Sequence, residues 1–172
     1  INARLADENR DIMLVTRKGM SIRFSEADVR ATGRASIGVR GITLRDDDYV
    51  IGMDICDPAN SLLIITETGF GKRTDIEEYR IQSRGGKGLL TYKISEKTGE
   101  LAGMMMVSDA DDVMLITTEG VIIRIHAADI STIGRNTSGV RLMRTTENNL
   151  IVSCARTDRE EDADDADGAE DG

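Results

Sequence analysis

A pattern of about 50 residues occurs three times along this chain of 172 residues. Each copy opens with a short apolar run that ends in threonine, and a glycine follows three residues later. The runs are Met13-Leu14-Val15-Thr16, Leu63-Ile64-Ile65-Thr66 and Met114-Leu115-Ile116-Thr117, and the glycines are Gly19, Gly69 and Gly120. Because a fixed period is the signature of a repeat architecture, it constrains the fold more than any single motif does.

The same register continues well beyond these glycines. An arginine stands four residues after each one, an acidic residue nine after and a second glycine nineteen after, and another arginine precedes the second glycine by four residues. In the order of the units these are Arg23, Arg73, Arg124; Asp28, Glu78, Asp129; Gly38, Gly88, Gly139; and Arg34, Arg84, Arg135. Agreement at this many positions indicates three copies of one structural unit.

Each unit contains short apolar runs that are rich in β-branched residues and bounded by turns. In the first unit, Ile12–Thr16 and Met20–Phe24 flank a turn that ends in Gly19, which predicts a hairpin because glycine accepts a positive φ. A second hairpin is expected in every unit. Its strands are 39–44 with 49–54, 89–94 with 99–107, and 140–144 with 150–154. Four strands per 50 residues indicate an all-β fold of propeller-like blades, a β-pinwheel in form.

The expected boundaries follow from the repeat and from the charge distribution. Residues 1–10 end a preceding blade, 11–57, 58–108 and 109–157 are three blades, and 158–172 form a disordered acidic tail. Pro58 falls in the link between the first two blades, and the stretch Ser25–Asp28 is a short capped helical turn or a loop. The chain begins at Ile1 rather than at methionine, so we expect it to be a fragment.

The net charge of −9 belongs almost entirely to the tail. Residues 158–172 hold nine acidic residues and one arginine, whereas residues 1–157 hold 22 acidic and 21 basic residues. The tail keeps the chain soluble, binds basic partners, or competes with DNA for the basic residues of the same chain. We favour the third hypothesis, since a tethered competitor acts at a high effective concentration.

The basic residues that recur with the period are the main candidates for a binding site. A ladder of cations along stacked units suits a phosphate backbone, which is contacted without reading the bases. The candidates are Lys18, Arg23, Arg34, Arg40, Lys72, Arg73, Arg84, Lys87, Arg124, Arg135 and Arg141. The alternative is that the repeated arginines pair with repeated acidic residues, as Arg23 would with Asp28, and join neighbouring units. The strand arginines fit that alternative better than the loop arginines do.

The segment Gln82–Gly88 is a second candidate. Its three glycines around Arg84 and Lys87 allow a close approach to a phosphate, whose oxygens backbone N–H groups can bind. It lacks the Gly-Lys-Ser/Thr ending of a P-loop, and a plain flexible connector is the alternative.

The residues for catalysis or metal binding are few. His126 is the only histidine, and we expect it to be an exposed residue at a strand end. Asp46–Asp48 and Asp109–Asp112 fit acidic turns better than a cation site, and Met104–Met106 fits a strand in the core. Cys56 and Cys154 are predicted to be free thiols in a reducing cytosol. We therefore expect no catalytic or metal-binding residue, and no apolar run reaches the length of a membrane span.

These motifs together resemble a known family. The stretches Val15–Phe24, Gly69–Thr74 and Ile133–Arg141 are similar to the last three repeats of the C-terminal DNA-wrapping domain of the A subunit of DNA gyrase, over residues 1 to about 157. The resemblance implies a disc of normally six blades, whose basic outer edge wraps double-stranded DNA in a bacterial cytoplasm. It also implies ATP, Mg²⁺, the rest of the A subunit and the gyrase B subunit as parts of the whole enzyme. None of Tyr49, Tyr79 and Tyr92 matches the family's catalytic motif.

The chain departs from the family in two respects. Only three blades are present, and the family's box Gln-Arg-Arg-Gly-Gly-Lys/Arg-Gly lies in the first blade, upstream of them. Residues 82–88 are similar to that box but carry Ser83 in place of the second arginine, so its phosphate-contacting role is carried over only to Arg84 and Lys87. The equivalent domain of topoisomerase IV and a propeller that serves as a protein-interaction scaffold are the alternatives.

Overall fold

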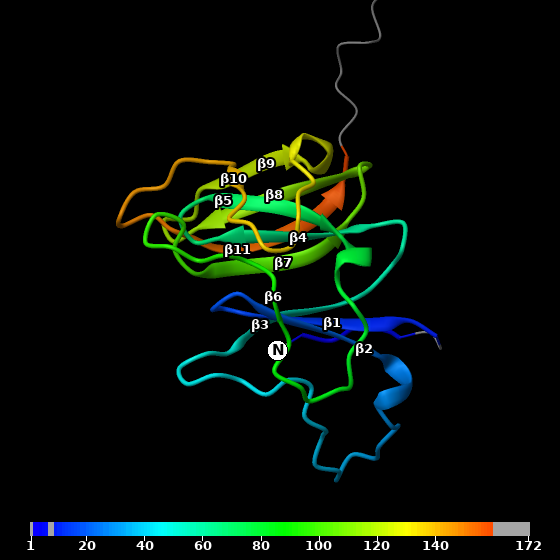
Figure 1. Cartoon of the computed structure of the whole chain (residues 1–172). Helices are drawn as coiled ribbons and strands as arrows, with labels where there is room; N and C mark the ends of the chain where they lie inside the picture. The colour runs from blue at the N-terminus through cyan, green and yellow to red at the C-terminus, as the bar shows by residue number, and fades with distance from the viewer. Residues whose placement is uncertain (1, 7–8, 160–172) are drawn as a thin grey trace, which may run out of the picture.

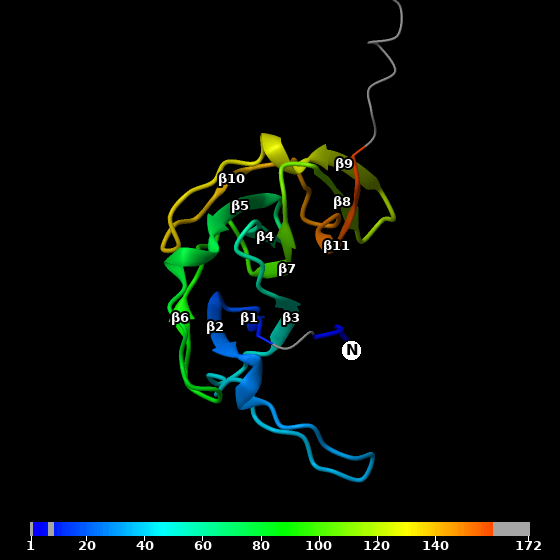
Figure 2. The ribbon, with the colours of Figure 1, turned by 90° about the vertical axis from the view of Figure 1, so that its right-hand side faces the viewer.

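The computed structural model describes residues 2–6 and 9–159, which form three antiparallel sheets arranged in an arc (Figures 1 and 2). The first sheet has the order β3 (Val50–Ile55), β1 (Asp11–Thr16), β2 (Met20–Ser25), β6 (Leu89–Leu90). The second has the order β10 (Val140–Arg141), β5 (Phe70–Asp75), β4 (Ser61–Thr66), β7 (Leu101–Val107). The third has the order β11 (Ile151–Asp158), β8 (Asp111–Thr117), β9 (Ile122–His126). The all-β, blade-like fold is confirmed.

The first hairpin of every unit has the same turn. Gly19 adopts φ +88°, as does Gly69, and Gly120 adopts φ +78°, a region that only glycine enters without strain. The repeated threonine fixes the other side of the turn. Thr16 Oγ1 accepts a 3.1 Å hydrogen bond from the backbone N–H of Met20, and Thr66 and Thr117 do the same in their units. The repeated threonine and glycine thus encode one turn.

The second expected hairpin was wrong in every unit. Leu89–Leu90 pairs with β2 of the preceding unit, Val140–Arg141 pairs with β5, and residues 39–44 form no strand. The hairpin of each unit has two edges with open backbone groups. The unit's own last strand covers the inner edge, and in the first two units the next unit covers the outer one. We call the crossing segments the arms: arm one is 29–45, arm two is 79–94 and arm three is 130–144.

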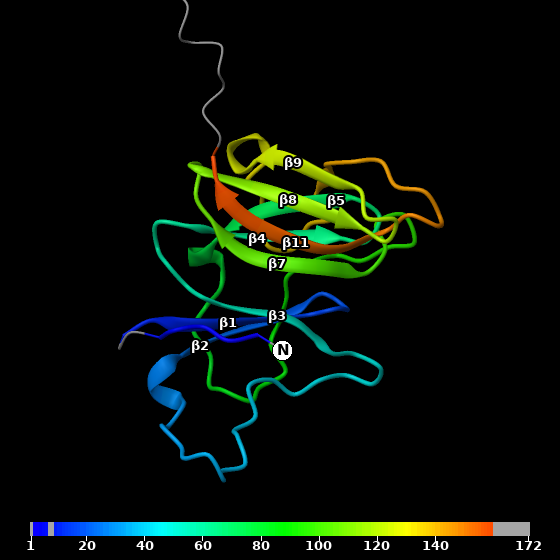
Figure 3. The same ribbon diagram turned by 180° about the vertical axis from the view of Figure 1, so that it is seen from behind.

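The aliphatic core lies between successive sheets. In the central strand β4, alternate residues point to opposite faces. Leu62 and Ile64 pack towards the first sheet, whereas Leu63 and Ile65 pack towards the third, and all four are fully buried. The expected core methionines 104–106 follow the same alternation in β7. The inner strands β3, β7 and β11 lie one against the next along the inside of the arc (Figures 2 and 3).

The smaller expectations have mixed outcomes. The helical turn is confirmed as the 3₁₀ turn η1 (Glu26–Asp28), where Ser25 Oγ accepts from the N–H of Ala27. The equivalent turns η2 (Ile76–Glu78) and η3 (Ala127–Asp129) lack this side-chain cap. Pro58 lies between β3 and β4. The third unit's last strand runs to Asp158, and the tail beyond residue 159 lies outside the described residues. No helix in the described part of the chain is long and apolar enough to cross a membrane.

Candidate nucleic-acid interface

The three arms carry basic residues and no acidic ones. Arm one has four arginines, arm two has two arginines and two lysines, and arm three has three arginines. They are Arg30, Arg34, Arg40, Arg45; Arg80, Arg84, Lys87, Lys93; and Arg135, Arg141, Arg144. The strands β6 and β10 of arms two and three form the outer contour of the arc, so these two arms run along its convex edge (Figure 2).

Neighbouring arms are joined to each other by backbone hydrogen bonds. The N–H of Gly85 donates to the carbonyl of Gly41 at 2.7 Å, which links arm two to arm one. The N–H of Lys93 donates to the carbonyl of Thr137 at 3.2 Å, which links arm two to arm three. The basic segments of the three units therefore form one continuous surface that follows the curve of the arc.

Four of the predicted site residues are exposed on this surface, namely Arg34, Arg40, Lys87 and Arg141. Five other exposed basic residues of the arms were not among the predicted ones: Arg30, Arg45, Arg80, Lys93 and Arg144. The repeat did not identify these residues, because none of them recurs in all three units. The signal that would have found them is the run of about 15 residues without an acidic side chain in each unit.

The strand arginines join the units instead. Arg23 pairs with Asp11 at 2.8 Å and donates to the carbonyls of Ile76 and Tyr79 in the next unit at 2.9 and 3.0 Å. The acidic partner is therefore Asp11 and not Asp28. The inter-unit role considered for these arginines fits Arg23 well.

Arg73 repeats this arrangement between the second and third units. Its guanidinium donates to Ser61 Oγ at 2.7 Å, to Asp109 at 2.6 Å and to the carbonyl of Ala127 at 2.9 Å. Arg124, the third of the set, pairs with Asp112 at 2.7 Å and bonds to the carbonyl of Asp158. These contacts hold the strand arginines within the fold.

The loop arginines of arms two and three are half-buried tethers. Arg84 donates to the carbonyls of Asp28 and Arg40 at 3.0 and 2.6 Å, both in the first unit. Arg135 binds the second unit in the same way, through its N–H to Glu78 and its guanidinium to the carbonyl of Leu90. Each loop arginine thus fastens its arm to the unit before it.

Lys72 is fully buried under arm three. Its ammonium group donates to the carbonyls of Gly134 and Thr137 at 3.0 and 3.2 Å, to that of Arg135, and lies 5.3 Å from the centre of the Tyr92 ring. Burial lowers the pKa of Lys72 to about 8, against the opposing effect of Glu78. This lysine holds the third arm on the second sheet and lies away from the surface.

The glycine-rich segment of arm two presents a single cation outward. The N–H of Gly85 is already used by the carbonyl of Gly41, and Arg84 is a tether, which leaves Lys87 as the exposed cation. Gly88 is required because the arm passes close to the strand beneath it. It adopts φ +78°, and a Cβ there would lie 2.3 Å from the carbonyl oxygen of Ser21 in the strand that the arm crosses.

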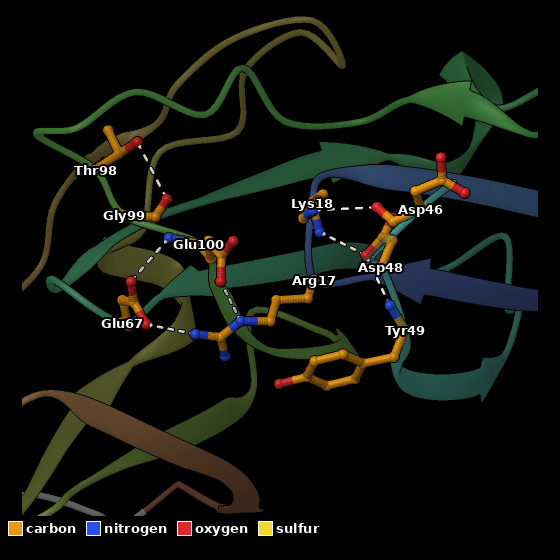
Figure 4. Close-up of polar contacts among 9 residues, drawn as sticks. All are labelled: Arg17, Lys18, Asp46, Asp48, Tyr49, Glu67, Thr98, Gly99 and Glu100. Atoms are coloured by element: carbon orange, nitrogen blue, oxygen red, sulfur yellow. Dashed lines mark hydrogen bonds and ion pairs between the residues drawn. The ribbon is translucent and has the colours of Figure 1, made fainter. Parts of the chain in front are cut away.

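The charges near the first hairpin turn are paired with each other (Figure 4). Arg17 bonds to Glu67 at 2.9 Å and to Glu100, both in the second unit, and its guanidinium lies 5.7 Å from the Tyr49 ring. Burial lowers the pKa of Arg17, but Glu100, Tyr49 and Glu67 together outweigh this effect and the pKa is raised. The predicted site residue Lys18 is half-buried here and donates to the carbonyl of Asp46 at 3.2 Å.

The acidic residues near the third unit also have structural partners. The expectation of a simple acidic turn at 109–112 was wrong for Asp112, which is fully buried in β8 and binds Arg124 and His126. His126 ends β9 as expected, but it is half-buried and lies 2.6 Å from Asp112. Within residues 2–6 and 9–159, no three His, Cys, Asp or Glu side chains gather into a metal site.

Both cysteines are free thiols, as predicted. Burial raises the pKa of Cys56 and that of Cys154 to about 12, so neither is a reactive thiolate at neutral pH.

Comparison with known proteins places the three units in one family. The family described as DNA gyrase C-terminal domain, beta-propeller, matches residues 10–57, 60–108 and 111–158. The A subunit of DNA gyrase from Staphylococcus epidermidis is 42% identical over 164 residues, which are 94% of this chain and 18% of the relative. The A subunit of DNA gyrase from Haloquadratum walsbyi is 43% identical over 169 residues, which are 97% of this chain and 20% of the relative. The chain thus spans about a fifth of these curated relatives.

Two solved structures share the fold. A DNA gyrase A C-terminal domain superposes with a TM-score of 0.81 at 26% identity, over 88% of this chain and 52% of that one. The C-terminal domain of a DNA topoisomerase IV superposes with a TM-score of 0.85 at 23% identity, over 91% of this chain and 49% of that one. The blade architecture predicted from the repeat is therefore that of known domains.

Proposed function

The chain belongs to the DNA gyrase C-terminal domain family, and we propose that it binds double-stranded DNA along its convex edge and bends the duplex around that edge. The observation that carries the proposal is the run of three acid-free arms, joined edge to edge on the outside of the arc. The arms hold 11 of the 22 basic residues of a chain whose net charge is −9, and nine of the 11 are exposed.

The chemistry of this surface suits the phosphate backbone. Exposed arginine and lysine side chains neutralise phosphates and release counterions, whatever the base sequence. The arms are mostly irregular segments and contain no α-helix, so they offer no recognition helix to enter a major groove. A curved basic surface favours bent DNA, because the additional phosphates that it reaches along the bend offset the bending energy.

We propose that the chain performs this role within the A subunit of DNA gyrase in the bacterial cytoplasm, where wrapping supports ATP-dependent negative supercoiling together with the B subunit. In this proposal ATP and Mg²⁺ act elsewhere in the enzyme, since the described acidic residues do not form a site that fits a magnesium ion. The equivalent role in topoisomerase IV is the second candidate, because a domain of that enzyme has the same fold. The sequence identity to the A subunit of gyrase favours gyrase.

The test is the affinity for labelled duplexes of several sequences as a function of salt. We expect similar affinities for all sequences, with log K falling linearly as log [salt] rises. The variant Arg80→Gln/Lys87→Gln/Lys93→Gln should weaken binding to every duplex and flatten the salt slope by about 2 to 3, near one for each phosphate that is no longer neutralised.

The matched control removes three exposed charges outside the arms, as Arg4→Gln/Arg156→Gln/Arg159→Gln. We expect this variant to keep most of the affinity and of the salt slope. Equal losses in the two variants would show that only the net charge matters and would refute the arm surface. No binding to any duplex at about 50 mM salt would favour a protein-interaction scaffold instead.

A further inference from the structure

Arm three is fastened to arm two by a group of backbone contacts. The guanidinium of Arg135 donates to the carbonyl of Leu90. The backbone N–H of Lys93 donates to the carbonyl of Thr137 at 3.2 Å, and the carbonyl of Lys93 accepts a 2.8 Å bond from Ser138 Oγ. The side chain of Lys93 is exposed. Arm three therefore holds the backbone of a lysine in arm two whose charge faces solvent.

The contact between arms one and two has the same form. Arg84 donates to the carbonyl of Arg40 at 2.6 Å, and the N–H of Thr43 donates to the carbonyl of Gly86 at 2.8 Å. In the order Arg84, Arg40, Thr43 and Gly86, the equivalent residues one unit later are Arg135, Leu90, Lys93 and Thr137. Because the contact recurs at equivalent positions, we regard it as a designed feature of the repeat and call it the arm joint.

The loop that carries Arg135 is fixed on other sides as well. The backbone N–H of Arg135 donates to Glu78 at 2.6 Å. Beneath the loop, the ammonium group of Lys72 donates to the carbonyls of Gly134 and Thr137 at 3.0 and 3.2 Å. Arg135 is half-buried, whereas Arg141 of the same arm is exposed. The two arginines of arm three thus have different surroundings, although the sequence gives both the same charge.

We propose that Arg135 is a positioning residue for DNA binding, which holds arm three against arm two so that Lys93 and Arg141 meet one duplex at a fixed separation. This inference rests on the proposed function. Binding must order the groups that contact the phosphates, and order that already exists in the free protein removes part of this cost. Arg135 then increases the affinity through the arm joint, while Lys93 and Arg141 make the contacts.

The salt dependence of binding distinguishes a positioning residue from a phosphate contact. Loss of one contact lowers the slope of log K against log [salt] by about 0.9 for duplex DNA, and we expect this result for Arg141→Gln. Arg135→Met should weaken binding about two- to tenfold without a change in slope, because only order is lost. Arg135→Lys keeps the charge but lacks the planar fork, so it should behave like Arg135→Met.

The arm joint is also observable without DNA, through the hydrogen exchange of the Lys93 amide measured by NMR. Both Arg135 variants should exchange this proton faster than the unaltered chain, because its acceptor lies in the released arm. Arg141→Gln should leave the exchange rate unchanged. Asn136→Ala, at the exposed position beside Arg135, is the matched control and should change neither the exchange nor the affinity. Circular dichroism checks folding, and Arg135→Lys replaces Arg135→Met if that variant unfolds.

The results separate this inference from the proposed function. An Arg135→Lys chain that binds as tightly as the unaltered chain, or an Arg135→Met chain whose slope falls by about 0.9, would identify a phosphate contact and overturn the inference. Unchanged exchange of the Lys93 amide in both Arg135 variants would overturn it as well. Failure of the unaltered chain to bind any duplex at about 50 mM salt would instead refute the proposed function, and a role of Arg135 toward DNA with it.

Discussion

The guanidinium of Arg73 donates a 2.9 Å hydrogen bond to the backbone carbonyl of Ala127, which joins a strand of the second unit to the 3₁₀ turn of the third. Arg23 makes the same bond to Ile76 one unit earlier, at 2.9 Å. In the first two units, the arginine four residues after the turn glycine is thus a joint between units. Its period follows the fold because each unit must be fastened to the next.

We expect Arg73→Met to lower the free energy of unfolding by about 2 to 3 kcal/mol. The substitution leaves Ser61 and the carbonyl of Ala127 without their donor in a buried setting, and unsatisfied groups are costly. Urea denaturation measures the change. Arg144→Met, at an exposed arm position, is the control and should change stability by less than about 0.5 kcal/mol. Equal effects would contradict the assignment of Arg73 as a buried joint.

A pH dependence of stability should arise from Lys72. Its pKa is about 8 in the folded chain against an ordinary value of 10.5, so between these values the unfolded chain binds more protons than the folded one. The free energy of unfolding therefore receives a contribution that rises with pH over this window. Lys72→Met removes that contribution. Denaturation of both proteins at several pH values checks the difference, and parallel pH profiles would contradict it.

Alanine at Gly88 should destabilise the chain, whereas alanine at Gly33 should not. At Gly88 the added Cβ would meet the carbonyl oxygen of Ser21 at 2.3 Å, and the positive φ is unfavourable for any other residue. We expect a loss of at least about 1 to 2 kcal/mol in the free energy of unfolding, since strain and a displaced strand act together. Thermal denaturation of the two variants provides the comparison. A stable Gly88→Ala chain would mean that arm two is not held against β2.

Removal of residues 160–172 tests the hypothesis about the acidic tail. The cut follows Arg159 because Asp158 belongs to β11 and its carbonyl binds Arg124. If the tail competes for the arms, the shortened chain should bind DNA more tightly at low salt, and the gain should fade as salt rises. Binding isotherms at several salt concentrations measure this effect. An affinity that does not change at low salt would refute competition by the tail.

The sequence showed the repeated arginines, but it did not show which of them bond to a neighbouring unit and which are exposed to solvent. The period predicted blades, hairpins and the turn glycines correctly, since these depend on residues close together along the chain. The period could not show which of Arg84 and Lys87 is exposed and which one bonds to the preceding unit. Both lie in one glycine-rich segment, yet Arg84 points back to the carbonyls of Asp28 and Arg40 while Lys87 is exposed. Which of two neighbouring cations faces solvent depends on contacts with another unit.

The sequence by itself determined the repeat, the all-β architecture, the aliphatic core and the position of every first hairpin, because local turn chemistry and alternation of apolar residues are written along the chain. Only the tertiary structure decided where the second half of each unit goes. Leu89–Leu90 and Val140–Arg141 leave their own units to cover the hairpin before them, since an open edge there has backbone groups to satisfy. That crossing joins the arms into one basic surface.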